Sequence, residues 1–328
     1  MHIAKAFQPI GYRGLLAVAL LALAACDAAE APREDVPVLA VDTGWPTIPA
    51  GAKFGEVSAV DVDAAGNIWV LHRAGRKWEE PFPATPIAEP TVFKFAPDGT
   101  LVAQWGAGVF IMPHGLSVDA DGKVWITDVA HEQVFRFSPE GVQELALGTR
   151  GVTAQDASHF GRPADIAFLG SRVLVADGYV NTRVAEFSPQ GTFLRDWGKF
   201  NVAHAVAVDE TRIYVADREN ARIMIYDHAA KLVEERKSPG GNHTYSLKPL
   251  GGGRLLAVEG RDRADRKGAI IRVYAADGRV EASYDISLPG KDASLGHDLA
   301  IGGDGHIYVA DVPAGRVVRF SLPQQSDQ

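Results

Sequence analysis

The chain repeats one unit six times, and this repeat limits the possible folds more than any other feature. Each unit begins with a short alternating strand, passes through a turn, and continues into a second apolar strand that ends in an acidic residue or its substitute. The six copies are SAVDVDAAGNIWVLH (58–72), HGLSVDADGKVWITD (114–128), PADIAFLGSRVLVAD (163–177), HAVAVDETRIYVAD (204–217), YSLKPLGGGRLLAVE (245–259) and HDLAIGGDGHIYVAD (297–311). Repeats of roughly forty to fifty residues without helical periodicity are typical of propeller blades.

Two further strands complete most units. Each copy is followed by a β-branched residue three positions before an aromatic one: Val92/Phe95, Val134/Phe137, Val184/Phe187, Ile223/Tyr226, Ile271/Tyr274 and Val317/Phe320. Glycine-containing turns then lead to a fourth strand. The sequence therefore predicts an all-β, six-bladed β-propeller with four-stranded blades. The sixth unit lacks a fourth strand, so we expect VPVLAVDTGW (36–45) to pair there and close the ring.

The N-terminus predicts export. An uncharged run, GLLAVALLALAAC, follows Lys5 and Arg13 and is too short to span a bilayer. Its last four residues, 23–26, resemble a bacterial lipobox, which predicts a lipoprotein signal peptide over 1–25 and a lipid on Cys26. The alternative is an ordinary secretory signal with a chance cysteine. We expect a flexible tether over 26–37, the propeller over 38–323 and a short tail over 324–328.

Charge and cysteine content narrow the possible partners. Cys26 is the single cysteine, so the exported domain would depend on packing rather than on disulfides. Removal of residues 1–25 takes away Lys5 and Arg13 and no acid, which lowers the net charge from −8 to −10. This balance argues against nucleic-acid binding. We expect a monomer in the bacterial cell envelope, anchored on the periplasmic side through the lipid of Cys26.

Three histidines occupy one position of the repeat. His114, His204 and His297 each begin the first strand of units two, four and six. The first strand of a propeller blade lines the central axis, and alternate blades of six are related by three-fold symmetry. The three imidazoles are therefore expected to converge and to bind zinc with one open coordination position. The alternative is that they are hydrogen-bonded structural residues.

Residues just after the second strands should emerge at the same face. They include Arg73 in the first unit, Tyr179 in the third and Arg218 in the fourth. Paired arginines beside a metal suit a substrate that carries a carboxylate, and a tyrosine there can act as a base. Each arginine alone could instead be a solvated surface residue. The recurring acids Asp128, Asp177, Asp217 and Asp311 are interpreted as scaffold residues that cap turns.

Three stretches carry a resemblance to a known family. MPHGLSVDADGKVWITDVAHEQVFRF, VADGYVNTRVAEFSPQGTF and VADRENARI resemble the peptidyl-α-hydroxyglycine α-amidating lyases, and the similarity extends from about Phe54 to Phe320. The resemblance implies an NHL-type six-bladed propeller with a catalytic zinc and a structural calcium. It places zinc on His114, His204 and His297.

The same resemblance assigns the other site residues. The catalytic tyrosine falls on Tyr179 and the catalytic arginines on Arg73 and Arg218. Calcium would be bound by Asp298 and by the backbone carbonyls of Val60 and Leu116, and such oxygen ligands suit calcium. The sequence departs from the family at Val180, where a disulfide cysteine would stand, and at Leu295-Gly296 before the last histidine.

These features predict an enzyme. The expected reaction is zinc-dependent cleavage of the C–N bond of a peptidyl- or N-acyl-α-hydroxyglycine, which yields an amide and glyoxylate without a redox cofactor. A smaller amidoglycolate such as ureidoglycolate is a possible variant substrate. One alternative is a non-catalytic NHL-type propeller that binds a protein or glycan outside the cytoplasm. Another is a calcium-dependent lactonase, although such sites depend on carboxylates rather than on histidines.

Overall fold

The computed structural model describes residues 36–42, 44–49, 52–260, 268–287 and 294–323. The predicted signal peptide, Cys26, the tether as far as residue 35, and the tail 324–328 lie outside these ranges. No helix among the described residues is long and apolar enough to cross a membrane.

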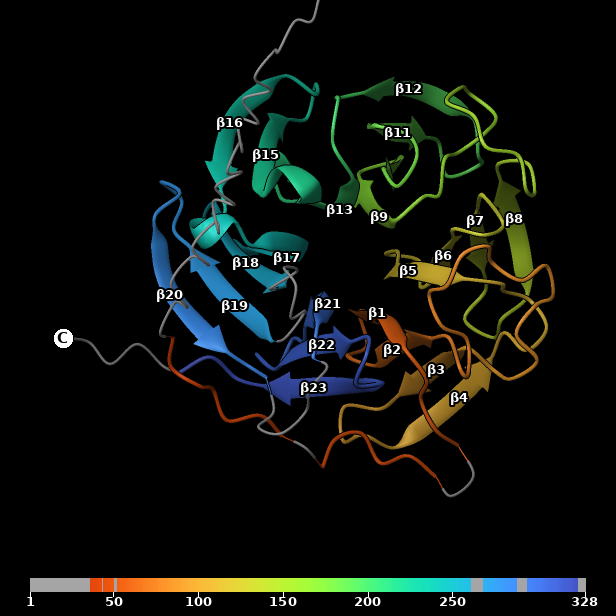
Figure 1. Ribbon diagram of the computed structural model, residues 1–328, viewed down its shortest axis with the longest axis horizontal. Coiled ribbons are helices and arrows are strands. Elements are labelled where there is room, and N and C mark those ends of the chain that lie inside the picture. The colour runs from red at the N-terminus through yellow and green to blue at the C-terminus, as the bar shows by residue number, and fades with distance from the viewer. Residues whose placement is uncertain (1–35, 43, 50–51, 261–267, 288–293, 324–328) are drawn as a thin grey trace, which may run out of the picture. The chain divides into compact units, whose positions relative to one another are not determined.

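Six antiparallel sheets are arranged in a ring about a central axis (Figure 1), which confirms the predicted six-bladed propeller. Blade one comprises β1 (Val57–Val62), β2 (Ile68–His72), β3 (Val92–Phe95) and β4 (Leu101–Trp105). Blade two comprises β5 (Pro113–Val118), β6 (Val124–Asp128), β7 (Gln133–Phe137) and β8 (Gln143–Leu147). Blade three comprises β9 (Asp165–Leu169), β10 (Arg172–Asp177), β11 (Arg183–Phe187) and β12 (Phe193–Trp197). Blade four comprises β13 (Ala203–Val208), β14 (Arg212–Asp217), β15 (Arg222–Asp227) and β16 (Leu232–Lys237). Blade five comprises β17 (His243–Gly251), β18 (Arg254–Gly260), β19 (Ala269–Tyr274) and β20 (Val280–Asp285). Blade six comprises β21 (Gly296–Ile301), β22 (Ile307–Asp311) and β23 (Arg316–Phe320). Two short 3₁₀ helices, η1 (Arg218–Asn220) and η2 (Pro239–Gly241), lie in blade four and between blades four and five.

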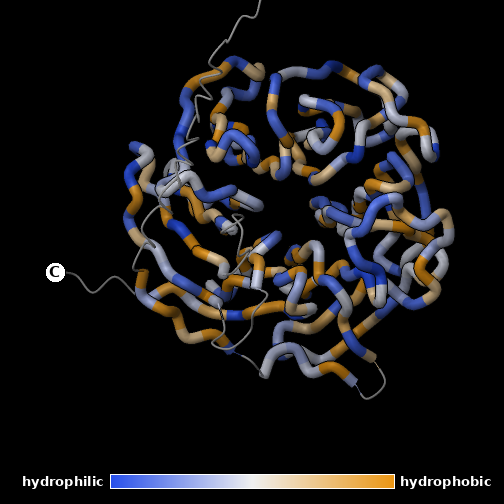
Figure 2. The backbone as a smooth tube through the Cα atoms, viewed as in Figure 1, coloured by the Kyte–Doolittle hydropathy of each residue, from blue (hydrophilic) through white to orange (hydrophobic). Residues whose placement is uncertain are grey.

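The hydrophobic core is divided among the interfaces between successive blades. Hydrophobic segments are found in every part of the ring (Figure 2). The second strands of the blades are buried along almost their whole length, and because successive side chains point to opposite faces, each sheet presents apolar side chains to both of its neighbours. Between blades one and two, for example, the buried side chains of Ala59 and Leu71 pack with Leu116 and Ile126. Comparable buried clusters fill the other five interfaces. Burying each leucine or isoleucine contributes about 1.5–3 kcal/mol, so the ring is stabilised blade by blade.

Carboxylates on the innermost strands link one blade to the next. The backbone N–H of Val118 in β5 donates to Asp61 in β1 over 2.8 Å. Equivalent bonds join Val206 to Asp165 over 2.9 Å and Val60 to Asp298 over 3.0 Å. These N–H groups lie on the inner edges of their sheets, where no further strand can accept them.

The N-terminal segment closes the ring less regularly than predicted. Asp42 forms an antiparallel bridge with Arg319 of β23, and its N–H donates to the Arg319 carbonyl over 2.8 Å. Leu39 instead bonds to Asp285 at the end of β20 in blade five. The described part of 36–45 is therefore not a continuous fourth strand, and the sixth sheet has three strands. Trp45 packs against Tyr308 and Phe95, with ring centroids 4.8 and 5.9 Å apart, and draws the segment across to blade one.

The acids that end the second strands accept backbone N–H groups, as their repetition predicted. Asp128 accepts from Ile111 and Met112 at the entry to β5. The related acceptors are Asp177 for Gly161, Asp217 for Asn201 and Asp311 for Leu295. In blade one the substitute is His72, whose Nδ1 accepts from Ala74 over 3.1 Å and from Gly55 over 3.4 Å.

Candidate metal centre and active site

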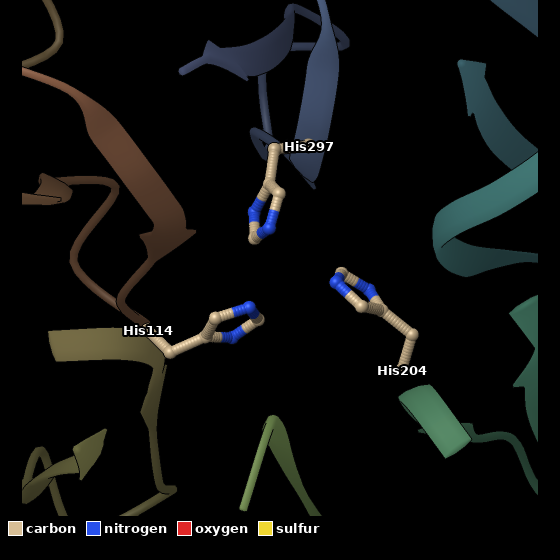
Figure 3. A group of neighbouring side chains, drawn as sticks. All are labelled: His114, His204 and His297. Atoms are coloured by element: carbon tan, nitrogen blue, oxygen red, sulfur yellow. The ribbon is translucent and has the colours of Figure 1, made fainter. Parts of the chain in front are cut away.

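His114, His204 and His297 converge on the axis from β5, β13 and β21. Their potential ligand atoms all lie within 4.8 Å of one another, and the three rings point toward a common centre (Figure 3). The ring centroids are 4.7–5.1 Å apart. All three side chains are buried, with 2–7% exposure. This cluster can bind a metal ion, and imidazole nitrogen suits zinc among other transition metals.

Each histidine is oriented by the blade that follows its own. The Nδ1 atoms bond to backbone carbonyls: His114 to Ala164 over 2.9 Å, His204 to Tyr245 over 2.7 Å and His297 to Ser58 over 2.7 Å. A carbonyl can only accept, so Nδ1 must carry the proton and Nε2 must carry the lone pair. The fold thus fixes the tautomer that a metal ligand requires.

Burial keeps these imidazoles neutral. Burial, together with the nearby His297 and Arg73, lowers the pKa of His114 well below its usual value. Burial and Arg218 do the same to the pKa of His204. Burial and Arg73 lower the pKa of His297 to about 3. Neutral imidazoles are competent ligands near pH 7 without the loss of a proton.

Tyr179 lies beside two of the histidines. It follows β10, and its hydroxyl is 2.9 Å from Nε2 of His114 and 3.1 Å from Nε2 of His204. Gly178 makes this position accessible, because a Cβ there would lie 2.3 Å from the backbone of Ala203. The hydroxyl therefore lies within hydrogen-bond distance of two members of the histidine cluster.

Arg218 completes a polar contact with the same hydroxyl. It begins η1 directly after β14, and its Nη1 donates to the Tyr179 hydroxyl over 3.1 Å. Its guanidinium lies 5.1 Å from the Tyr179 ring and 5.2 Å from the Tyr245 ring. Burial alone would lower the pKa of Arg218, but Tyr179, Tyr245 and Glu219 raise it, so the group stays cationic.

Arg73 is buried at the end of β2 with one nitrogen unused. Its Nε donates to the carbonyl of Pro113, next to His114, over 3.0 Å, and its Nη1 donates to Glu56 over 3.1 Å. Nη2 has no hydrogen-bond partner among the described residues. A buried donor without a partner costs about 1–3 kcal/mol, which a bound anion would offset.

Trp78 is a component that the sequence did not reveal. Its ring lies 5.1 Å from Tyr179, 5.9 Å from His114 and 5.2 Å from the Arg73 guanidinium. It belongs to the long connection 73–91 between β2 and β3, which matches no repeated motif. The unusual length of this connection was the available signal, because long loops in compact domains are often functional.

The predicted calcium donors lie deeper along the axis, on β1, β5 and β21. Asp298 accepts hydrogen bonds from Ser246 over 2.7 Å and from the N–H of Val60 over 3.0 Å. In an antiparallel strand the N–H and C=O of one residue face the same side, so the Val60 carbonyl also faces away from β2. The same parity applies to Leu116, two residues before the inward-facing N–H of Val118. These oxygen donors fit a hard cation.

A lysine shares this part of the channel. Burial and the nearby Asp298 carboxylate raise the pKa of Asp165. Burial alone would lower the pKa of Lys248, but Asp61, Asp298 and Asp165 raise it. The ammonium group of Lys248 therefore offsets part of the negative charge that a calcium ion would otherwise neutralise.

Comparisons with known proteins agree with this geometry. The NHL repeat family matches residues 110–137. A probable peptidyl-α-hydroxyglycine α-amidating lyase of Caenorhabditis elegans is 29% identical, over 82% of this chain and 83% of the relative. Peptidyl-glycine α-amidating monooxygenase B of Xenopus laevis is 33% identical, over 85% of this chain and 35% of the relative. This chain is a homologue of the amidating lyases.

The share of the relative's length that this chain covers differs between the monooxygenase and the lyase. The chain spans about a third of the length of the Xenopus monooxygenase and most of the length of the nematode lyase. A solved streptogramin B lyase has a TM-score of 0.58 with 13% identity, over 83% of this chain and 95% of the other, and shows the fold alone. Homology to amidating lyases and the clustered site together support a lyase enzyme.

Proposed function

We propose that this chain is a zinc-dependent C–N lyase that converts a peptidyl- or N-acyl-α-hydroxyglycine to an amide and glyoxylate. The observation that carries this proposal is the set of three neutral imidazoles with Nε2 lone pairs directed at one point, with the Tyr179 hydroxyl 2.9–3.1 Å from two of them. Zinc bound there would supply Lewis-acid chemistry that makes the substrate α-hydroxyl more acidic.

Tyr179 is proposed to move the proton. Its oxygen acts as the phenolate and takes the proton of the α-hydroxyl, and the electron pair of that O–H bond forms the new C=O as the C–N bond breaks. The same proton then passes to the departing amide nitrogen, so Tyr179 returns to its starting state. Arg218, which donates to the Tyr179 oxygen over 3.1 Å, stabilises negative charge on that oxygen.

The arginines are proposed to anchor the substrate carboxylate. Nη2 of Arg73 is buried and has no partner among the described residues, although Glu56 holds the rest of the guanidinium in place. A carboxylate would satisfy this donor through a charge-assisted hydrogen bond. The α-carbon would then lie between Arg73 and the histidine cluster, where its hydroxyl can reach Tyr179.

Calcium and the lipid anchor extend the proposal. We propose that Asp298 and the carbonyls of Val60 and Leu116 bind a structural calcium ion, which would neutralise the paired carboxylates of Asp298 and Asp165. The N-terminal motif 23–26 supports a lipid-anchored protein on the periplasmic side of a bacterial membrane, attached through Cys26.

The test is glyoxylate release from N-acetyl-α-hydroxyglycine by purified residues 26–328, with zinc content measured in the same samples. His114→Ala is the control. Release by the native sequence that the variant loses is expected. A zinc-loaded protein that releases no glyoxylate would contradict the lyase assignment, and a protein without zinc or turnover would favour a binding module.

A further inference from the structure

The space next to the histidines on the axis is too small for a substrate. The cavity that His114, His204 and His297 share with Asp165 and Asp298 measures about 10 Å³, which is room for a single water molecule. A substrate must therefore reach the cluster from the side of Tyr179. Trp78 covers that side, since its ring contacts both Tyr179 and His114.

Trp78 is held over the site by a defined set of contacts. Phe82, in the same connection, packs edge-on against it at 5.1 Å. Glu80 forms a two-pronged ion pair with Arg162, with N–O distances of 2.7 and 2.9 Å, and the Arg162 guanidinium lies 5.1 Å from the Phe82 ring. The connection from blade one is thereby attached to the start of blade three.

Arg76 fixes the near end of the same connection. Its Nη1 donates to the carbonyl of Ile111 and its Nη2 to the carbonyl of Thr85, each over 3.0 Å. Both contacts tie the connection to itself and to the entry of β5. Trp78 is therefore a positioned side chain on a braced loop, and it stays partly exposed.

The chemistry of the reacting carbon determines what Trp78 meets. Three substituents of that carbon matter: the carboxylate is assigned to the arginines, the hydroxyl to the histidine cluster and Tyr179, and the third is the acylated nitrogen. The acyl group must therefore leave the cluster along the remaining approach, which Trp78 borders. Indole binds flat apolar groups well, since aromatic pairs gain stability beyond the area they bury.

We propose that Trp78 is a specificity-determining residue that contacts the acyl group and favours aromatic or large apolar acyl groups over acetyl. This inference rests on the proposed function, because it takes the positions of the carboxylate and hydroxyl from it. It adds a substrate class: α-hydroxyglycines whose acyl part presents an aromatic or bulky apolar side chain next to the amide.

The test compares N-benzoyl- and N-acetyl-α-hydroxyglycine as substrates of the zinc-loaded native protein, Trp78→Ala and Trp78→Phe. Trp78→Ala is expected to lower kcat/KM about tenfold for the benzoyl substrate and less than about threefold for the acetyl substrate. Trp78→Phe should keep most of the benzoyl preference. Trp197→Phe, on the outer strand β12, is the matched control and should leave the ratio unchanged.

Equal losses for both substrates, or no loss for either, would overturn the inference. A second measurement separates it from the proposed function: calorimetric binding of N-benzoylglycine and N-acetylglycine, which lack the hydroxyl and cannot react. Tighter binding of the benzoyl compound that Trp78→Ala abolishes would support the contact even if no variant released glyoxylate. Equal affinities in the native protein would overturn it, whatever the turnover.

Discussion

Blades two, four and six differ from blades one, three and five at one equivalent position near the start of the innermost strand. The even blades supply His114, His204 and His297, whose side chains form the cluster. The odd blades supply Ala164, Tyr245 and Ser58, whose backbone carbonyls accept the Nδ1–H groups. At this one position of the repeat, the even blades thus contribute candidate metal ligands through side chains, and the odd blades contribute orientation through the main chain. In a repeat protein, blades with the same backbone fold can therefore supply different parts of one site: a specific side chain from one blade and only a backbone carbonyl from the next.

Loss of a side chain from an even blade should have the largest effect. His297→Ala removes one of three candidate ligands, so zinc content should fall to background and glyoxylate release should drop at least about a thousandfold. Metal analysis and turnover on the same preparation check this. Full zinc content with undiminished turnover would show that the even blades are not the source of the metal site.

Tyr179→Phe should separate the role of this residue in proton transfer from any role in metal binding. The phenyl ring keeps the packing against Trp78 but removes the hydroxyl, so kcat should fall about 10²–10⁴-fold while zinc stays bound. Turnover measured beside metal content separates the two effects. A proportional loss of zinc would mean that Tyr179 supports the metal site instead of the proton transfer.

His72, a buried histidine of blade one, should affect the pH dependence of folding stability and not the activity. His72 is 1% exposed, and burial lowers its pKa to about 4, whereas the unfolded chain has a value near 6.5. Between these values the unfolded state binds more protons, so stability is lost as the pH falls from 6.5 to 4, by about 3 kcal/mol at most.

Urea unfolding at several pH values checks this prediction by difference. His72→Asn keeps an acceptor for the Ala74 N–H but cannot titrate, so its stability should fall less steeply over that window than that of the native protein. All other buried histidines are common to both proteins and cancel. Parallel pH profiles for the two proteins would rule out a contribution from His72.

Ser58→Ala should have the smallest effect. The carbonyl that orients His297 belongs to the main chain and survives the substitution. Only the 3.3 Å bond from the Ser58 hydroxyl to the Pro113 carbonyl is lost, at a cost to stability of about 1 kcal/mol. Turnover should stay within about twofold of the native value. A tenfold fall would mean that the Ser58 side chain itself, and not only its carbonyl, takes part in the site.

The same division explains which parts of the site the sequence could predict. The three histidines share a register within the repeat, so their convergence followed from strand alternation and ring symmetry. Tyr179, Arg73 and Arg218 came from their place after second strands and from the family resemblance, and the structure brings them beside the cluster. The carbonyl acceptors could not be predicted, because every residue has a backbone carbonyl and its use does not depend on which amino acid is present.

Two other features escaped prediction for different reasons. Trp78 lies in a connection without periodicity, and an ion pair between residues 80 and 162 attaches this connection to a segment far away in the sequence. The segment 36–45 has the alternation of a strand, but its described residues make only isolated bridges, and Trp45 packs against rings of blades one and six. Propensity describes each residue locally, and long-range packing decides between regular and irregular pairing.

The bond from His297 to Ser58 joins residues 239 positions apart, one in the last blade and one in the first. The third ligand is therefore oriented only after the two ends of the propeller have met. Metal uptake would then depend on complete assembly, because a partly folded chain whose final blade has not docked presents two oriented candidate ligands and a third that is not aligned. Tight metal binding would then require a closed ring, and a bound ion would stabilise the closed ring against opening between the first and last blades.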